Sequence, residues 1–229
     1  MTWIKICGIT NLEDALTALE ADANALGFVF YEKSPRNVHP EIVHRIVAQL
    51  PRTVEKVGVF VNRDAGRAVE IARHCGLTAI QIHLQLPASP APTIPVLAVA
   101  SQGTRMYLAL PAGWLLSDAP IRLNLASLTA PGHPFDALFL DSGTPESPGG
   151  TGMTFDWEKV APRVQELRQT LHIVVAGGLT PANVTEAIRI LKPWGVDVSS
   201  GVEASPGKKD PEKVRAFIRA VRNTEKNNP

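Results

Sequence analysis

Cys7 and Asp141 stand out as two ionisable side chains that could carry proton transfer. Each ends a short apolar segment, Lys5-Ile6-Cys7 in the first case and Phe139-Leu140-Asp141 in the second. Thiol and carboxyl groups serve as general acids or bases when their surroundings adjust their pKa values. A lone cysteine in an apolar segment is more often a small buried hydrophobic residue. A functional interpretation of the pair therefore depends on the residues around it.

Polar residues alternate with aliphatic residues in four short segments of the chain. On a strand this alternation sends the two kinds of side chain to opposite faces. Buried polar groups are costly unless they are paired or used. Taken singly, His83 could be a buried histidine whose ring is hydrogen-bonded and has no functional role. Lys5 and Asp197 could form an ion pair with a purely structural role. Polar side chains from four strands that face the same interior favour a functional site. The inward-facing polar residues are Lys5, Cys7, Gln81, His83, Asp141, Asp197 and Ser199.

Three loops rich in glycine and hydroxyl residues lie in the last third of the chain, over residues 148–152, 176–180 and 199–202. Glycine lets a backbone approach a phosphate closely, and free amides donate to it. A single Gly-Gly pair is more often a turn, but three such loops at one end of a barrel favour a phosphate site. We expect that site to contain Gly152, Gly177, Gly178, Ser199, Ser200 and Gly201.

Strand-like and helix-like segments alternate and predict the scaffold that brings these residues together. Such alternation implies parallel strands with right-handed crossovers. Eight strands in this length favour a single (β/α)8 TIM barrel, whose chemistry gathers at the C-terminal strand ends. The expected strands are Trp3–Ile9, Ala25–Tyr31, Glu55–Val61, Ala79–Leu84, Val96–Ser101, Ala137–Ser142, His172–Gly178 and Gly195–Ser200.

Helix-start signals and proline content refine this α/β prediction. Thr10 and Glu13 match a capping box. Thr180-Pro181 and Asp210-Pro211 each combine an N-cap residue with proline at the first helical position. Residues 85–135 contain eight prolines, which predicts an irregular crossover between strands five and six. We expect one catalytic domain over residues 1–222 and a polar tail over residues 223–229.

Composition argues against several classes of protein. The chain has 23 basic and 22 acidic residues, so no overall field attracts nucleic acid or an anionic membrane. Cys7 and Cys75 form neither a disulfide framework nor a metal-binding pattern. No Gly-x-Gly-x-x-Gly or P-loop pattern follows the first strand, which argues against a dinucleotide cofactor. There is no signal-peptide pattern or long apolar segment. We expect a cytoplasmic protein with no nucleic-acid or membrane partner.

Ten segments, in order along the chain, match one known pattern. They are Lys5–Thr10, Gly27–Phe30, Ser34–Arg36, Val57–Asn62, Leu140–Ser142, Gly149–Gly152, Phe155–Trp157, Ala176–Pro181, Val196–Glu203 and Pro206–Asp210. Together they resemble the phosphoribosylanthranilate isomerase family of tryptophan biosynthesis. The likeness covers about residues 3–84 and 137–222, and residues 85–135 carry little of it. After His83 the family usually has glycine and then an acid, where this chain has Leu84-Gln85-Leu86.

The resemblance implies an Amadori rearrangement, in which N-(5'-phosphoribosyl)anthranilate becomes 1-(2-carboxyphenylamino)-1-deoxyribulose 5-phosphate. It makes Asp141 the general acid that protonates the ring oxygen, and Cys7 the general base that takes the proton from C2'. It assigns the anthranilate carboxylate to Arg36, whose forked donors suit a planar anion. It also implies a small phosphoribosyl substrate, no cofactor or metal, and a monomer or a homodimer.

Three further inward-facing residues are expected to bind substrate: Lys5, Gln81 and His83. A free thiol has a pKa of ~8.5. Cys7 therefore needs help to ionise near neutrality, and we hypothesise that Lys5, one pleat away, provides it.

Two other functions remain open from the sequence. The first is another phosphosugar barrel enzyme, such as the related isomerase of histidine biosynthesis or an enzyme that serves both pathways. That isomerase pairs two aspartates, so Cys7 argues against it. The second is a barrel that only binds phosphorylated ligands. Such a protein would have no need of Cys7, Asp141 and Arg36 together.

Overall fold

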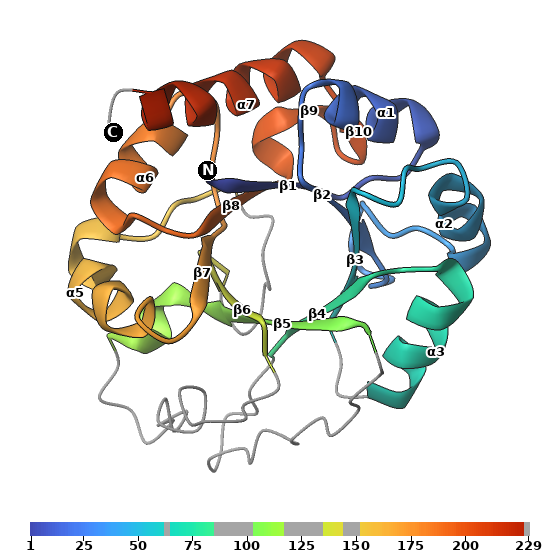
Figure 1. Ribbon diagram of the computed structural model, residues 1–229, viewed down its shortest axis with the longest axis horizontal. Coiled ribbons are helices and arrows are strands. Elements are labelled where there is room, and N and C mark those ends of the chain that lie inside the picture. The colour runs from blue at the N-terminus through green and yellow to red at the C-terminus, as the bar shows by residue number, and fades with distance from the viewer. Residues whose placement is uncertain (62–64, 85–102, 117–134, 144–151, 227–229) are drawn as a thin grey trace.

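A closed barrel of parallel strands forms the centre of the protein. The computed structural model describes residues 1–61, 65–84, 103–116, 135–143 and 152–226. Within these ranges, eight strands pair in chain order, and β8 pairs back with β1 (Figure 1). They are β1 (Trp3–Cys7), β2 (Ala25–Val29), β3 (Glu55–Phe60), β4 (Ala79–His83), β5 (Arg105–Pro111), β6 (Ala137–Asp141), β7 (His172–Val175) and β8 (Gly195–Val198).

Helices surround this ring of strands (Figure 1). They are α1 (Leu12–Glu20), α2 (Pro40–Val47), α3 (Ala65–Cys75), α5 (Trp157–Leu167), α6 (Val184–Leu191) and α7 (Pro211–Lys226), with 3-10 helices η1 (Ala112–Leu115) and η2 (Ser200–Val202). After β8, the short strands β9 (Glu203–Ser205) and β10 (Lys208–Lys209) form an antiparallel hairpin. None of the helices in the described ranges is long and apolar enough to span a membrane.

The predicted barrel is confirmed, and seven of its eight strands begin at the predicted residue. The fifth strand was predicted wrongly: β5 is Arg105–Pro111, and Val96–Ser101 lies outside the described residues. Both segments are short and apolar, so composition does not choose between them. Strand pairing identifies residues 105–111 as the fifth strand, because Tyr107 aligns with Gln81 of β4 and with Ala137 of β6. Of the crossover from β5 to β6, residues 117–134 lie outside the described residues.

The start of α1 differs from the predicted capping box because a distant partner takes one of its residues. Asn11 is the N-cap, and its Oδ1 accepts a hydrogen bond from Asp14 N at 2.9 Å. Thr10 Oγ1 instead donates to Gly207 O at 2.6 Å. Glu13 forms an ion pair with Lys208. The loop after β1 is therefore attached to the β9–β10 hairpin.

The predicted N-terminal end is correct for α7 and wrong for α6. Asp210 caps α7 as predicted, because its Oδ1 accepts hydrogen bonds from the backbone amides of Glu212 and Lys213. The start expected at Thr180-Pro181 was wrong, since α6 begins at Val184 after a turn in which Asn183 Oδ1 accepts from Thr180 N. At its other end α7 extends to Lys226, so residues 223–226, expected in a polar tail, are helical.

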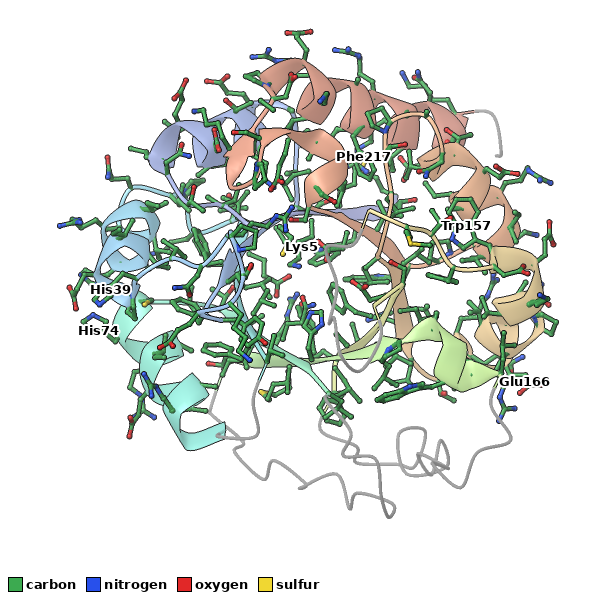
Figure 2. All side chains as sticks on the ribbon, turned by 180° about the vertical axis from the view of Figure 1, so that it is seen from behind. Lys5, His39, His74, Trp157, Glu166 and Phe217 are labelled. Atoms are coloured by element: carbon green, nitrogen blue, oxygen red, sulfur yellow. The ribbon has the colours of Figure 1, made fainter. Side chains whose placement is uncertain are left out.

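Two sets of apolar side chains separate on the two faces of the strands. Ile4 and Ile6 belong to the large cluster between barrel and helices. Tyr107 and Phe139 belong to a smaller cluster inside the barrel. Lys5 lies between Ile4 and Ile6 in sequence and inside the barrel in space (Figure 2). The alternation therefore sends polar side chains inward, as predicted.

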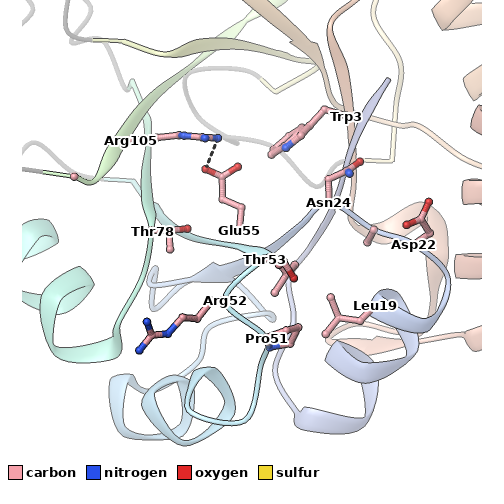
Figure 3. Close-up of a pocket in the computed structure, with 13 residues that line it drawn as sticks. Trp3, Leu19, Asp22, Asn24, Pro51, Arg52, Thr53, Glu55, Thr78 and Arg105 are labelled. Atoms are coloured by element: carbon pink, nitrogen blue, oxygen red, sulfur yellow. Dashed lines mark hydrogen bonds and ion pairs between the residues drawn. The ribbon is translucent and has the colours of Figure 1, made fainter. Parts of the chain in front are cut away.

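A second polar group lies at the N-terminal ends of the strands. Glu55 Oε1 accepts a hydrogen bond from the Tyr107 hydroxyl at 2.7 Å. It accepts another from Arg105 Nη1 at 3.2 Å (Figure 3). Burial and the nearby Glu55 raise the pKa of Tyr107, so its hydroxyl stays a donor. Beside this group is an open pocket of about 670 Å³, which Trp3 also lines (Figure 3).

Candidate active site

A small pocket of about 90 Å³ lies at the C-terminal ends of the barrel strands. Because all eight strands are parallel, these ends meet at one face of the barrel. The pocket therefore brings Cys7 and Asp141 together, although 134 positions separate them in the sequence (141 − 7). Its polar lining residues are Cys7, Tyr31, Ser34, Arg36, His83, Asp141, Asp197 and Ser199.

Cys7 ends β1 and occupies space that a glycine on β2 leaves free. A Cβ atom at Gly27 would lie 2.8 Å from Cys7 Sγ and 2.9 Å from Lys5 Cε, which is too close. Burial raises the pKa of the Cys7 thiol, and the charges of Lys5 and Lys209 act in the opposite direction. The expected influence of Lys5 has the right sign, but burial outweighs it. The thiol is therefore the predominant form at neutral pH.

Lys5 places a buried positive charge beneath the pocket. Its Nζ lies 3.0 Å from Asp197 Oδ1 and 5.2 Å from the centre of the Phe139 ring. Burial would lower the pKa of Lys5, but Asp197 and Cys7 raise it above its ordinary value, so the ammonium group keeps its charge. Asp197 reaches the pocket itself, and burial raises its pKa despite Lys5.

The surroundings of Asp141 favour the protonated form of its carboxyl group. Its Oδ1 accepts a hydrogen bond from Gly143 N at 2.7 Å. Burial raises the pKa of the Asp141 carboxyl group, and the Gly143 amide and Lys5 only partly offset that effect. A carboxyl group with a raised pKa can donate a proton at a pH where an exposed aspartate would be fully ionised.

His83 is the neutral member of the pocket. Burial and the charge of Lys5 lower its pKa to about 4, so its ring is uncharged at pH 7. Gln81 Nε2 lies 3.0 Å from His83 Nε2. In this arrangement the amide donates and Nε2 accepts, which puts the ring proton on Nδ1. Gln81 and Lys5, both expected at the substrate, are absent from the described pocket lining, and each contacts a residue that belongs to it.

The described ranges hold no group of three or more side chains that could bind a metal ion.

Arg36 reaches the pocket from the loop after β2 and is held by Glu203. Arg36 Nε donates to Glu203 Oε1, and Nη2 donates to Oε2, both at 2.8 Å. Lys209 Nζ lies 3.0 Å from the same Oε1. Two parallel hydrogen bonds between guanidinium and carboxylate fix both distance and orientation. The guanidinium therefore has a defined position in the pocket wall.

The glycine-rich loops pack directly on one another. A Cβ atom at Gly177 would lie 2.3 Å from Ser142 N, one at Gly178 2.3 Å from Met153 O, and one at Gly201 1.9 Å from Leu179 O. Only glycine permits such contacts, and they join the loops after β6, β7 and β8. Gly152 has a φ of +74°, while residues 149–151 lie outside the described residues.

Ser199 and Ser200 lead from β8 into η2. Ser199 lines the same pocket as Cys7. Its buried hydroxyl oxygen has no hydrogen-bond partner in the described part of the chain.

Comparison with known proteins identifies the family of this chain. The family model for N-(5'phosphoribosyl)anthranilate (PRA) isomerase matches residues 4–102 and 119–220. The chain belongs to this family. The match includes residues 85–102 and 119–135, where the sequence alone had shown little likeness to these isomerases. The family pattern is therefore more extensive than expected.

Individual relatives cover nearly the whole chain. The N-(5'-phosphoribosyl)anthranilate isomerase of Geobacter sp. (strain M21) is 44% identical over 218 residues, covering 95% of this chain and 97% of that protein. The crystal structure of phosphoribosyl anthranilate isomerase from Thermotoga maritima matches with a TM-score of 0.80 and 38% identity, over 97% of this chain and 100% of that one. Another structure of this isomerase contains reduced 1-(o-carboxyphenylamino)-1-deoxyribulose 5-phosphate and matches with a TM-score of 0.77 and 36% identity, over 97% of this chain and 100% of that one.

Sequence reasoning missed several residues of the isomerase pocket. Tyr31 and Ser34 line it, and Glu203 and Lys209 support Arg36 from behind. Ser34, Glu203 and Lys209 all lie within segments that match the family pattern. The contact between Glu203 and Arg36 spans 167 positions of the chain, which local patterns do not reveal.

Proposed function

We propose that this chain converts N-(5'-phosphoribosyl)anthranilate to 1-(2-carboxyphenylamino)-1-deoxyribulose 5-phosphate in tryptophan biosynthesis, with Asp141 as general acid and Cys7 as general base. Membership of the isomerase family supports the reaction. The observation that carries the two roles is that Cys7 and Asp141 line one small pocket from different strands.

Asp141 is proposed to open the sugar ring. Its carboxyl group gives a proton to the furanose oxygen, the bond from that oxygen to C1' breaks, and the anthranilate nitrogen forms a protonated Schiff base with C1'. The raised pKa of Asp141 supports this role, because the residue must be protonated when the substrate binds.

Cys7 is proposed to take the proton from C2' of the Schiff base. The electrons of the C2'–H bond then form a double bond between C1' and C2', and those of the Schiff base return to nitrogen, which gives an enolamine. The enolamine becomes the ketone when C1' takes up a proton and the C2' hydroxyl group loses one. The Schiff base is positively charged, and a nearby positive charge lowers the pKa of a thiol. Opening of the ring by Asp141 therefore helps to ionise Cys7 at the step that needs the thiolate, against the effect of burial.

Other parts of the site are proposed to hold the substrate. Arg36 offers its remaining N–H groups to the anthranilate carboxylate, and neutral His83 offers its Nδ1 proton as a donor. The phosphate is proposed to bind at the packed loops after β6, β7 and β8, where Gly177, Gly178 and Ser199–Gly201 lie. Lys5 and Gln81 act on this site through Cys7, Asp197 and His83.

The alternatives of histidine-pathway activity and of binding without turnover are tested in one assay. The purified protein is incubated with N-(5'-phosphoribosyl)anthranilate and, separately, with the substrate of the histidine-pathway isomerase, and products are identified by mass spectrometry. We expect turnover of the anthranilate compound. Binding of that compound without turnover, or turnover of the other substrate alone, would contradict the proposed function.

The oligomeric state and the cellular location of the protein are also proposed. We propose a cytoplasmic enzyme that acts on a small phosphoribosyl compound as a monomer or a homodimer. A relative from Thermotoga maritima, 36% identical over 97% of this chain, is described as a dimeric isomerase from which monomers were generated. The mass of this protein in solution, from light scattering, decides between the two states.

A further inference from the structure

Three charged side chains are buried together next to the pocket. The side chain of Glu203 is 5% exposed, that of Lys209 0%, and that of Arg36 12%. Glu203 accepts hydrogen bonds from both cations, and Lys209 also donates to Ser199 O at 3.2 Å. Burial would raise the pKa of Glu203, but Arg36 and Lys209 hold it below its ordinary value, so the carboxylate stays ionised.

The way in which Glu203 binds Arg36 leaves one edge of the guanidinium unused. A guanidinium has five N–H donors in a fixed plane. Glu203 takes one from Nε and one from Nη2, and no other described residue accepts from the remaining three, on Nη1 and Nη2. The Nη1–Nη2 edge can therefore receive a second carboxylate in the same two-bond geometry.

Arg36 is also fixed relative to Cys7. A Cβ atom at Gly8 would lie 2.8 Å from Arg36 Cδ, so the arginine side chain lies directly over the residue that follows Cys7. Gly8 therefore leaves the space that the aliphatic part of the Arg36 side chain occupies next to Cys7.

Glu203 is held by the β9–β10 hairpin, which is itself anchored to the start of the chain. Lys209 N donates to Asp14 Oδ2 at 2.8 Å, and Gly207 O accepts from Thr10. Asp14 and Lys209 are both buried. The support behind Arg36 therefore includes α1, the loop after β1 and the hairpin, and it is rigid before any substrate arrives.

We propose that Glu203 is a positioning residue that sets the specificity for an aromatic amine bearing a carboxylate. By occupying the Nε–Nη2 edge of Arg36, it turns the Nη1–Nη2 edge towards the substrate. This inference rests on the proposed function and adds to it a residue that does not touch the substrate. Lys209 supports Glu203 from the opposite side.

The test measures selectivity for the carboxylate. Two product analogues are used: reduced 1-(o-carboxyphenylamino)-1-deoxyribulose 5-phosphate and the same compound without its carboxyl group. Their dissociation constants are measured for the wild type, Glu203→Gln, Glu203→Asp and the control Glu212→Gln. Glu212 receives the same substitution, but it lies on α7, where its side chain is 79% exposed and pairs with Arg215. The kcat and KM for N-(5'-phosphoribosyl)anthranilate are measured on the same samples.

We expect Glu203→Gln to weaken binding of the carboxylated analogue by ~10–100-fold, the effect of losing a charge-assisted hydrogen bond. Binding of the other analogue should change by less than about twofold, and KM should rise much more than kcat falls. Glu203→Asp keeps the charge but is one methylene shorter, so we expect a smaller loss of the same kind. Glu212→Gln should bind both analogues as the wild type does.

Equal weakening of both analogues in Glu203→Gln would overturn the inference, because it would indicate general distortion of the pocket. Unchanged binding of both would overturn it as well. If Glu203→Gln does not fold, as judged by circular dichroism, Glu203→Asp provides the decision by the same selectivity criterion. A wild type that binds neither analogue and turns over no substrate would refute the proposed function itself, a result that differs from both of these.

Discussion

The two ends of the barrel bury carboxyl groups in opposite ways. At the N-terminal end, Glu55 receives hydrogen bonds from Tyr107 and Arg105, and these three side chains connect β3 to β5. At the C-terminal end, Asp141 receives only backbone amides among the described residues and borders a pocket shared with the thiol of Cys7. The first arrangement connects strands of the barrel, and the second is the one to which we assign proton transfer in the proposed function.

The larger of the two pockets is not the one that holds the candidate catalytic residues. The N-terminal pocket has a volume of about 670 Å³ and the C-terminal pocket about 90 Å³. The smaller one is nevertheless lined by three acidic groups whose pKa values burial raises, namely Cys7, Asp141 and Asp197. Perturbed titration in a concave site is a better guide to catalysis than volume.

The strongest test of this contrast removes the reacting groups. We expect Cys7→Ala and Asp141→Asn each to lower kcat by roughly 10³-fold, within the range for loss of a general acid or base. Circular dichroism should show a folded barrel in both variants. Wild-type kcat in both would show that neither residue has the proposed role.

Gly27→Ala should have the next largest effect, because the added Cβ displaces Cys7 Sγ and Lys5 Cε. We expect kcat/KM to fall by about 10²-fold, as for a displacement of a reacting group by about 1 Å. Gly113→Ala is the matched control, since nothing lies within 4 Å of a Cβ at that position. Equal losses in the two variants would contradict the steric explanation.

Removal of the buried ion pair tests the charge beneath the pocket. Lys5→Met combined with Asp197→Asn eliminates both charges without leaving either one buried alone. Lys5 lowers the pKa of Cys7 more than Asp197 raises it, so the pKa should rise in the variant. We expect the alkaline limb of the pH profile of kcat/KM to move to higher pH and activity at pH 7 to fall. An alkaline limb at the wild-type position would refute the proposed influence of Lys5.

Tyr107→Phe tests the other end of the barrel. It removes the hydroxyl that donates to Glu55 at 2.7 Å and should reduce the free energy of unfolding by about 1–2 kcal/mol. Urea denaturation measures that loss, and kcat should stay within about twofold of the wild type. A large fall in kcat would mean that the two ends are not functionally separate.

The smallest effect we predict is a pH-dependent gain in stability in Asp141→Asn. Burial raises the pKa of Asp141 in the folded state, so ionisation of its carboxyl group destabilises the fold as pH rises through that pKa. Asparagine does not ionise. The variant should therefore be more stable than the wild type at pH 8, and the difference should vanish below pH ~3.9, where aspartate is protonated even in the unfolded chain. Denaturation at several pH values measures this, and a gain that grew towards low pH would have the wrong sign.

The sequence predicted the barrel because alternation is local and repeated. Ile4 and Ile6 face the helices while Lys5 and Cys7 face inward, and the same pattern recurs on other strands. Residues 105–111 were assigned no strand, because both they and residues 96–101 are apolar and only pairing with β4 and β6 distinguishes them.

The site was harder to predict where a side chain binds a residue far away in the sequence instead of the neighbour that the local pattern suggests. Thr10 fits a capping box, yet it binds Gly207, and Asn11 caps the helix instead. Glu203 has no local feature that connects it to Arg36, which lies 167 positions earlier. The residues proposed to react were chosen from their types, whereas Glu203 and Lys209 were not found in that way.

The distance between Arg36 and Glu203 along the chain also has a consequence for synthesis. At ~5–20 residues per second, a ribosome needs roughly 8–33 s to proceed from the arginine to its carboxylate partner. During that interval Cys7 and Arg36 have already been made, but nothing holds the guanidinium in place. The newly made protein therefore becomes competent to recognise its substrate only after Glu203 has been translated.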